Sequence, residues 1–227
     1  MDCVVISLGG SILVPGDNDS AHIKALALLI RSLAKKHRLV LVCGGGRVAR
    51  YYISIGRELR AGQDQLDEMG IEVTRLNAGL LQIALGDEAA PRLPRTIQEA
   101  EDELRNGKIV VMGGTDPGHT TDAVSAMVAK RVGAARIVNA TSVDAAYSAD
   151  PLKHPDATRF SELTHKQLFE LVNKGLHRAG PSDVFDKLGA EIALKANIPI
   201  LIVSGRDLEE IESAVNGRKV KGTIVRD

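Results

Sequence analysis

The sequence predicts an α/β protein in which helices cover both faces of a mostly parallel sheet. Short apolar runs alternate with longer segments of helical periodicity along all 227 residues. The apolar runs are almost unbroken, which is typical of parallel strands that are buried on both faces. No linker, repeat or low-complexity tract interrupts this alternation. We therefore expect one domain over residues 1–227.

Three apolar runs in the first half of the chain predict strands, and each ends in glycines that predict a tight loop. The strands are expected at Cys3–Leu8, Leu39–Cys43 and Lys108–Met112. Apolar residues at helical spacing predict helices over residues 20–36, 47–59, 71–85, 97–105 and 121–132. The stretch Gly62–Gly70 is polar and acidic, so the third of these helices is expected to begin only at Ile71.

Further along the chain the same alternation continues. Strands are expected at Ala135–Asn139, Pro199–Ser204 and Thr223–Val225, and helices at Lys166–Lys174, Val184–Ala196 and Leu208–Val215. Between them, Thr141–Thr158 is rich in Asp, Ser, Pro and Ala, which predicts a long loop or a short hairpin. This stretch divides an N-terminal half, about residues 1–140, from a C-terminal half, about residues 141–227, that shares the same sheet.

Composition excludes several classes of function. Lys and Arg number 29, as do Asp and Glu, so no basic field favours a nucleic acid or a membrane as partner. Aromatic residues make up 3% of the chain, which leaves little for stacking on bases. The longest apolar stretch, near Ala25–Ile30, is too short for a membrane span, and the N-terminus lacks signal-peptide features. Cys3 and Cys43 lie in apolar runs and predict buried thiols rather than a disulfide or a metal site, in a cytoplasmic protein.

The glycine clusters predict a site for phosphate groups. In open α/β sheets ligands bind at the carboxyl ends of strands, and three predicted strands end there in glycines: Gly9-Gly10, Gly44–Gly46 and Gly113-Gly114. Glycine lets backbone N–H groups approach a phosphate, and the N-terminus of a following helix adds a favourable dipole. One such loop is usually a plain turn, but three in one chain indicate a site for several phosphates.

Standard nucleotide motifs fit this site poorly. The Walker-type sequence GxxxxGK[ST] is absent. The residues Gly44–Ala49 match a relaxed G-x-G-x-x-A dinucleotide pattern, with Asp67 about 20 residues later. That loop follows the second strand, however, and Asp67 does not follow a convincing strand. Binding of a nicotinamide cofactor is therefore a second-rank alternative.

Charged and hydroxyl side chains follow the glycine loops. Arg47 and Arg50 lie on neighbouring positions of one predicted helix, and arginine binds phosphate oxygens bidentately. In the segment Met112–Ala123, hydroxyl groups and a helix N-terminus favour a second anionic group, and Asp122 would lie in the first helical turn. His119 in the same loop is expected to be structural rather than a catalytic base. The polar segment Thr141–Pro151 offers hydroxyls, carboxylates and a tyrosine that could surround a base and a ribose.

Four segments in this order carry a resemblance: the loop Gly9-Gly10-Ser11, the loop Gly44–Gly46, GGTDPGHTTDA at 113–123 and VDAAYSADP at 143–151. Together they resemble the amino acid kinase superfamily and, within it, the archaeal-type uridylate (UMP) kinases. The likeness extends to the tail Lys221–Ile224. It implies a three-layer αβα sandwich, transfer of phosphate from ATP to UMP with Mg²⁺ in pyrimidine nucleotide biosynthesis, and a homohexamer.

The resemblance also implies roles for individual residues, with UMP held mainly by the N-terminal half and the ATP nucleoside by the C-terminal half. The implied catalytic residues are Arg47, Arg50 and Asp122. The implied ATP-binding residues are Gly9, Gly10, Ser11, Gly46, Arg50, Thr141, Ser142, Tyr147 and Asp150. The implied UMP-binding residues are Gly45, Asp67, Thr115, Asp116, Pro117, Gly118, His119, Thr120 and Thr121, with Asp67 on the ribose.

The sequence departs from the superfamily in two places. Many members carry a lysine in the first strand that neutralises the transferring phosphate, whereas this chain has Ser7, so Arg47, Arg50 or Mg²⁺ would have to serve instead. The usual Val-Asp-Gly-Val-Tyr becomes Val143–Tyr147 with alanines at the two variable positions. Two alternatives stay open: a kinase of another small acceptor, such as isopentenyl phosphate or an amino-acid carboxylate, and a non-catalytic nucleotide sensor or storage shell on this fold.

Overall fold

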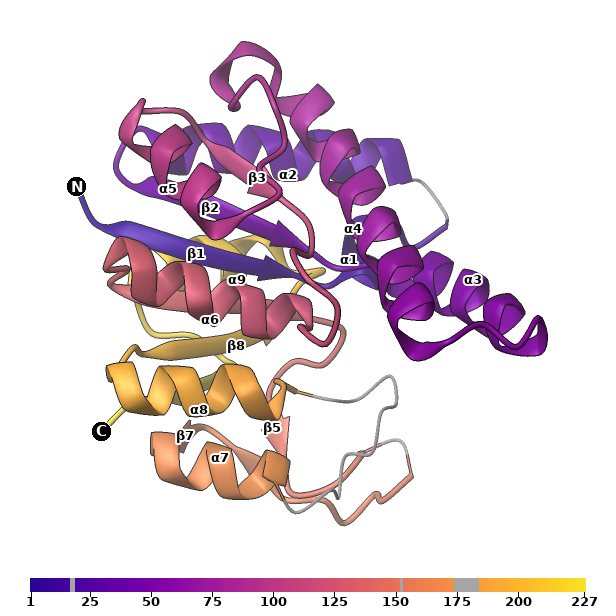
Figure 1. The fold of residues 1–227 in the computed structure, drawn as a ribbon. Coiled ribbons are helices and arrows are strands. Elements are labelled where there is room, and N and C mark those ends of the chain that lie inside the picture. Colours follow the sequence, from indigo (N-terminus) through magenta and orange to yellow (C-terminus); the bar gives the residue numbers. More distant parts are fainter. Residues whose placement is uncertain (17–18, 152, 174–183) are drawn as a thin grey trace.

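The structure is a computed structural model that describes residues 1–16, 19–151, 153–173 and 184–227. Among these residues, a seven-stranded sheet has the strand order β3-β2-β1-β4-β8-β9-β7 (Figure 1). The strands from β3 to β8 are parallel, whereas β9 is antiparallel to β8 and β7 runs parallel to β9. The predicted mostly parallel sheet is thus confirmed. In sheet order the strands are Val110–Met112, Arg38–Cys43, Cys3–Leu8, Arg136–Thr141, Ile200–Ser204, Thr223–Val225 and Glu162–Leu163.

Helices form a layer on each face of this sheet, as the resemblance implied (Figure 1). One layer contains α2 (Asp19–Ala34), α4 (Gln63–Leu85) and α9 (Leu208–Val215). The other contains α5 (Ile97–Arg105), α6 (Thr121–Val132), α7 (His165–Asn173) and α8 (Lys187–Ala196). The remaining elements are α1 (Gly10–Leu13), α3 (Gly46–Glu58), a 3-10 turn η1 (Gly86–Glu88), and the hairpin of β5 (Ala146–Tyr147) and β6 (Arg159–Phe160).

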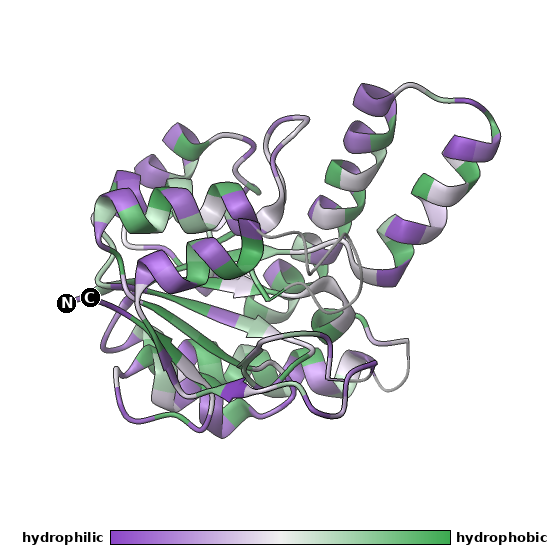
Figure 2. Cartoon of the chain, turned by 90° about the horizontal axis from the view of Figure 1, so that it is seen from below, coloured by the Kyte–Doolittle hydropathy of each residue, from purple (hydrophilic) through white to green (hydrophobic). Residues whose placement is uncertain are grey.

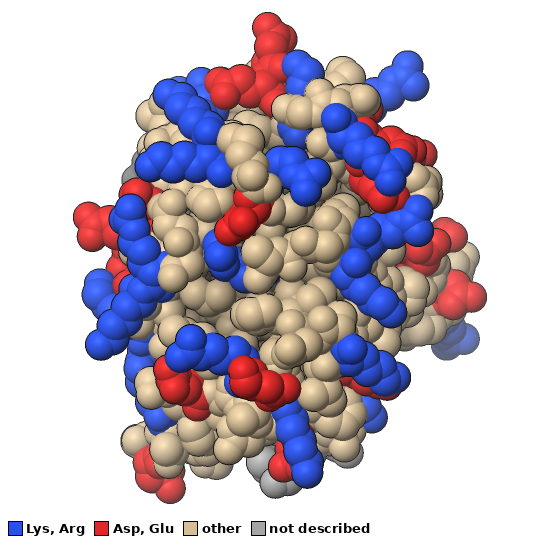
Figure 3. All heavy atoms as spheres, turned by 90° about the vertical axis from the view of Figure 1, so that its left-hand side faces the viewer, with Lys and Arg blue, Asp and Glu red and all other residues tan. Residues whose placement is uncertain are grey.

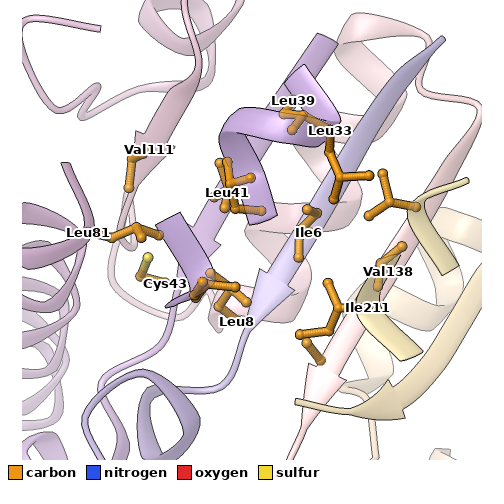
Figure 4. Close-up of a cluster of buried hydrophobic side chains, with 14 of the residues drawn as sticks. Ile6, Leu8, Leu33, Leu39, Leu41, Cys43, Leu81, Val111, Val138 and Ile211 are labelled. Atoms are coloured by element: carbon orange, nitrogen blue, oxygen red, sulfur yellow. The ribbon is translucent and has the colours of Figure 1, made fainter. Parts of the chain in front are cut away.

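The central strand β1 packs against both helical layers. Its side chains alternate, so that Val4, Ile6 and Leu8 face the layer of α2, α4 and α9 (Figure 4). Cys3 and Val5 face the other layer. Each buried aliphatic side chain contributes about 1.5–3 kcal/mol relative to an exposed one, which is why the sequence of this strand is almost continuously apolar. Figure 2 shows the same pattern, with apolar residues concentrated on the strands and on the helix faces turned toward them.

Both cysteines are buried free thiols, which confirms their predicted role in the core. Cys43 ends β2 and lies in the cluster shown in Figure 4. Burial raises the pKa of the Cys43 thiol to about 12, because the charged thiolate would lose its hydration there. Cys43 therefore acts as a small apolar side chain directly before the second glycine loop.

The expected start of one helix at Ile71 is wrong, because α4 already begins at Gln63. Gln65 Oε1 accepts a hydrogen bond of 3.0 Å from the backbone N–H of Gly62, which satisfies one free donor at the helix N-terminus. Asp64 lies in the first turn, where a negative charge complements the helix dipole. The acidic stretch is thus the N-terminus of α4 rather than a loop.

Smaller differences concern the ends of other elements. The expected loop after β1 instead forms the short helix α1. Thr141–Thr158, expected as a long loop or a short hairpin, contains the first strand of a hairpin, β5, whose partner β6 begins directly after it at Arg159. The helix expected from Val184 begins at Lys187, after Asp186, whose side chain accepts a hydrogen bond from the Gly189 N–H as N-cap. Lys174, the expected end of α7, lies outside the described residues.

Charged side chains of both signs lie on the amino-terminal edge of the sheet. Figure 3 looks onto this edge, where Lys and Arg side chains surround an uncharged area and acidic side chains lie among them. Arg105 near the end of α5 and Arg131 near the end of α6 both pair with Glu101, each at 2.6 Å. Such cations complement the carboxyl ends of helices. Among the described helices, none is both long and apolar enough to cross a membrane.

Candidate active site

Two cavities adjoin at the carboxyl edge of the sheet, toward which the arrows of β1 and β2 point in Figure 1. The first, the glycine cavity, has a volume of about 330 Å³ and lies at the ends of β1, β2 and β4. The second has a volume of about 360 Å³ and lies between α3, α4 and the loop before α6. We name it the hairpin cavity after the pair of helices α3 and α4, which is distinct from the β5–β6 hairpin. Gly45, Gly46, Arg50 and Thr121 line both cavities. Groups bound in the two cavities would therefore meet beside these residues.

Most of the predicted site residues lie in these cavities. The predicted site residues that line the glycine cavity are Gly9, Gly10, Ser11, Gly45, Gly46, Arg47, Arg50, Thr121, Asp122, Thr141 and Ser142. The hairpin cavity is lined by Gly45, Gly46, Arg50, Asp67, Gly118, His119, Thr120 and Thr121. Neither of the two cavities is lined by Thr115, Asp116, Pro117, Tyr147 or Asp150.

The first two glycine loops lie in backbone contact with each other. A Cβ atom on Gly10 would overlap the backbone of Gly44, Gly45 and Gly46. Gly46 also has a φ of +61°, a left-handed conformation that favours glycine. The Gly44 N–H donates a hydrogen bond of 2.8 Å to the carbonyl of Leu8, which fixes the second loop to the end of β1. Glycine is thus required here for the packing of the two loops.

Two helix N-termini point into the site. Helix α3 begins at Gly46 and α6 begins at Thr121, and both residues line both cavities. Thr120 caps α6, with its hydroxyl accepting a hydrogen bond of 3.1 Å from the Ala123 N–H. The N-terminus of a helix carries a partial positive charge and free N–H donors, so the region between the cavities favours anions.

The two predicted arginines have different positions. Arg50 lines both cavities, and its Nη2 lies 3.3 Å from Ser11 Oγ. Arg47 lines only the glycine cavity, and its guanidinium donates a hydrogen bond to the carbonyl of Pro15. Arg50 is therefore the arginine placed to contact anionic groups in both cavities.

Helix α4 holds the loop that precedes α6. Thr74 Oγ1 accepts a hydrogen bond of 2.7 Å from the Gly114 N–H, and Asp67 Oδ2 accepts one of 2.8 Å from the Gly118 N–H. Gln63 donates a further hydrogen bond of 2.7 Å to Asp67 Oδ1. His119 Nδ1 lies 4.0 Å from Asp116 Oδ2 at the edge of the hairpin cavity. The loop is thus tied to the same helix that forms the opposite wall of this cavity.

Polar side chains of the C-terminal half make a separate cluster. The Tyr147 hydroxyl donates a hydrogen bond of 2.9 Å to Asp144, and Arg159 pairs with the same carboxylate at 3.1 Å. Desolvation alone would raise the pKa of Asp144, but the hydrogen bonds from Tyr147 and Arg159 outweigh it and lower that pKa. Asp150 is buried and pairs with Lys153 at 3.3 Å.

Several residues of the site were not predicted as functional from the sequence. Ser7 Oγ donates a hydrogen bond of 2.8 Å to Asp122 Oδ1, and Asn139 also lines the glycine cavity. Asp186 accepts a hydrogen bond from the Thr120 hydroxyl and so links α8 to the start of α6. A signal for Ser7 and Asn139 was present, because each is a polar residue at a buried position of an otherwise apolar strand. Asp186 had no such signal, because the sequence placed it inside a helix expected to begin at Val184.

Comparison with known proteins places the chain among phosphotransferases. Residues 2–204 match the Amino acid kinase family. The uridylate kinase of Methanobrevibacter smithii is 40% identical over 222 residues, which cover 98% of either chain. The uridylate kinase of Methanoculleus marisnigri is 44% identical over 99% of this chain and 96% of its own. The crystal structure of the uridylate kinase from Archaeoglobus fulgidus has a TM-score of 0.88 at 41% identity and covers 99% of this chain.

The contact between the glycine loops predicts the effect of one added methyl group. Because the Cβ of Gly10→Ala would meet backbone, we expect this change to lower the free energy of unfolding by about 1–3 kcal/mol. The measurement is urea-induced unfolding followed by circular dichroism.

Gly79→Ala is the matched control. Gly79 lies in the interior of α4, and the nearest atom to its added Cβ would be Leu93 Cδ1 at 3.9 Å. Alanine is favoured over glycine in a helix by about 0.5–1 kcal/mol, so this variant is expected to gain stability. A Gly10→Ala protein as stable as the wild type would contradict the packing described here.

Proposed function

The chain belongs to the amino acid kinase family, and on that premise we propose that it is a UMP kinase, which transfers the γ-phosphoryl group of ATP to UMP. The products are ADP and UDP, and UDP leads on to the pyrimidine nucleotides UTP and CTP. One observation of the structure carries the proposal: two cavities, each large enough for part of a nucleotide, share Arg50 and two helix N-termini. The full-length similarity to uridylate kinases identifies the acceptor.

We assign the phosphates of ATP to the glycine cavity. The loops around Gly10 and Gly46 and the Ser11 hydroxyl supply donors there, and Arg50 adds a positive charge. Thr141 and Ser142 line the same cavity, at the end of β4. We assign the ATP base and ribose to the segment beyond them, which includes Tyr147 and Asp150, in the C-terminal half of the domain.

We assign UMP to the hairpin cavity. Ile53 and Ile71, from α3 and α4, give this cavity an apolar wall suited to the face of a base. Asp67 lies in the same cavity, and a carboxylate accepts more hydrogen bonds than the two that Asp67 already receives. A ribose hydroxyl is therefore a suitable donor to Asp67. The loop Thr115–Thr121 encloses the UMP side, and its end at Thr121 reaches the boundary with the glycine cavity.

The reaction needs positioning and charge neutralisation rather than a general base. A UMP phosphate oxygen, which is already anionic, attacks the γ-phosphorus of ATP in line, and the bond to the oxygen bridging to the β-phosphorus breaks. Arg50 is placed to contact both the attacking phosphate and the transferring group, because it lines both cavities. Arg47 is a second cation of the glycine cavity and would have to leave the Pro15 carbonyl to reach a phosphate.

The donor set fits Mg²⁺ delivered with ATP. Within the described ranges, no group of three or more His, Cys, Asp and Glu side chains gathers to hold a metal ion. Mg²⁺ is usually held by one or two carboxylates together with substrate phosphates, and Asp122 is a carboxylate in the glycine cavity. Bound in this way, the ion would neutralise charge on the β- and γ-phosphates. We propose that Asp122 orients that ion or its water ligands.

We propose that the chain forms a homohexamer and acts in the cytoplasm. Leu76, Leu80 and Ile83 form an exposed stripe along α4, and Leu28 is exposed on the neighbouring helix α2. Ile83, at one end of this stripe, is 79% exposed, and contiguous exposed apolar side chains mark contact surfaces. A second copy of the same chain would cover these residues. Across a two-fold axis the same patch of both copies meets, so an apolar patch on one copy is covered by the apolar patch of the other.

The first test measures ADP release from ATP and Mg²⁺ with UMP, CMP, dUMP, AMP, isopentenyl phosphate or no acceptor. We expect turnover with UMP well above that with AMP or without acceptor. Binding of ATP without turnover on any acceptor would instead identify a nucleotide sensor. Turnover on isopentenyl phosphate but not on UMP would identify a kinase of another acceptor.

The position of Arg50 predicts a loss of activity without a loss of fold. Arg50→Ala is expected to lower kcat/KM about 10-fold or more, since it removes a charge-assisted contact of about 1.5–3 kcal/mol. Arg57→Ala is the control, because Arg57 is exposed on the same helix and lines neither cavity. Unchanged kinetics in a folded Arg50→Ala enzyme would remove Arg50 from the site.

The exposed stripe predicts the effect of a buried charge on assembly. Ile83→Glu would bring a carboxylate into an apolar contact between copies, so we expect dissociation into smaller species in sedimentation velocity. Leu188→Glu, on α8 in the opposite helical layer, is the matched control and should keep the assembly of the wild type. An unchanged assembly in Ile83→Glu would show that this stripe is not a contact between copies.

A further inference from the structure

Two polar side chains interrupt the apolar core beneath the glycine cavity. Ser7 of β1 lies beside Asn139 of β4 in the register of the sheet, and the exposed fractions of these residues are 2% and 3%. Two pairs earlier in the same register, and so on the same face, lie the apolar residues Val5 and Ile137. Polar groups at such positions are unfavourable unless they are hydrogen-bonded, so their partners indicate what they do.

Ser7 is hydrogen-bonded to a residue in the first turn of α6. Its hydroxyl donates a hydrogen bond of 2.8 Å to Asp122 Oδ1, and both residues line the glycine cavity. The two residues are far apart in the sequence, and helix α6 packs directly on β1. The contact therefore joins the rigid centre of the sheet to the one carboxylate of the described chain that lines the glycine cavity.

The start of α6 is also held from α8. The Thr120 hydroxyl donates to Asp186, and Asp186 in turn caps α8. Gly189 in the first turn of α8 allows close approach, because an added Cβ would lie 3.1 Å from the Asp122 carbonyl oxygen. These contacts fix the backbone around Asp122. The direction of the Asp122 carboxylate depends instead on its side-chain contacts. Among these, the hydrogen bond from Ser7 comes from the sheet.

We propose that Ser7 is a positioning residue, which directs the Asp122 carboxylate toward the transferring phosphoryl group. This inference rests on the proposed function and deepens it. A serine hydroxyl carries no charge, so Ser7 does not itself neutralise phosphate. It holds Asp122 in one orientation, so that the carboxylate does not have to be ordered again in each turnover. Loss of this contact should slow the transfer step more than it weakens the binding of ATP or UMP.

The principal test compares Ser7→Ala with Ser7→Thr in steady-state kinetics with ATP and UMP. Ser7→Ala is expected to lower kcat about 10-fold, in line with the loss of a hydrogen bond to a charged group, and to leave KM within about 2-fold. Ser7→Thr keeps the hydroxyl and should recover most of the lost kcat. Wild-type kcat in Ser7→Ala, or no recovery in a folded Ser7→Thr, would overturn the proposal.

Ser125→Ala is the matched control. Ser125 is equally buried, lies on the same helix as Asp122, and donates a hydrogen bond of 2.7 Å to the Thr121 carbonyl. It does not line the glycine cavity. Like Ser7→Ala, this change removes one buried hydroxyl group near Asp122. It therefore measures how far a general loss of packing lowers kcat. We expect Ser125→Ala to keep the kcat of the wild type, and an equal loss in both variants would overturn a specific role for Ser7.

A double-mutant cycle separates action through Asp122 from any other effect. If Ser7 works by orienting this carboxylate, Ser7→Ala should cause no further loss of kcat in an Asp122→Asn background. Equal losses in the two backgrounds would overturn the proposal. Ser7→Cys, which is close to serine in size, replaces Ser7→Ala in the cycle if the alanine variant does not fold. Absence of UMP-dependent turnover in the wild type would overturn the proposed function and this role with it, whereas an active wild type with an unaffected Ser7→Ala overturns only this role.

Discussion

Gly10 and the segment Gly44–Gly46 lie in backbone contact at the ends of β1 and β2, and the rest of the site depends on this contact. It brings two loops closer together than side chains would allow. As a result α3 starts directly at the boundary between the two cavities, and Arg50 is presented to both. The apolar strands beneath make the contact rigid, since Leu8 and Cys43, which precede the loops, are both fully enclosed in the core.

The charge of the site comes from its arrangement rather than from an excess of basic residues. The chain has as many acidic as basic residues, and Arg105 and Arg131, near the carboxyl ends of α5 and α6, are both paired with Glu101. At the carboxyl edge, two helix N-termini and Arg50 converge on one small region. A site of this kind stabilises transferring phosphate with groups that are already oriented, so little reorganisation accompanies the reaction.

At the site, a few polar contacts join segments that are far apart in the sequence. Asn139 on the sheet donates a hydrogen bond to the Val184 carbonyl, and Asp186 accepts one from Thr120 in the loop before α6. Thr223 on β9 bonds to both Ala146 and Phe160 of the hairpin that carries Tyr147. These contacts link the segment we assign to the ATP nucleoside with the loop we assign to UMP, so the separation of donor and acceptor is set by the sheet between them.

The sequence by itself determined the α/β class, most of the strands and the positions of the glycine loops, because apolar runs and glycines act locally. It also indicated Arg50 and Asp122 through their place after those loops, whereas the expected role of Asp67 came from the resemblance to uridylate kinases. The early start of α4 was missed. The acidic residues before Ile71 suggested a loop, but acidic residues also stabilise the first turn of a helix. Only the tertiary structure decided that Arg50 rather than Arg47 lines both cavities, and that Ser7 contacts Asp122. Such relations depend on how distant strands and helices pack, which no local pattern of residues encodes.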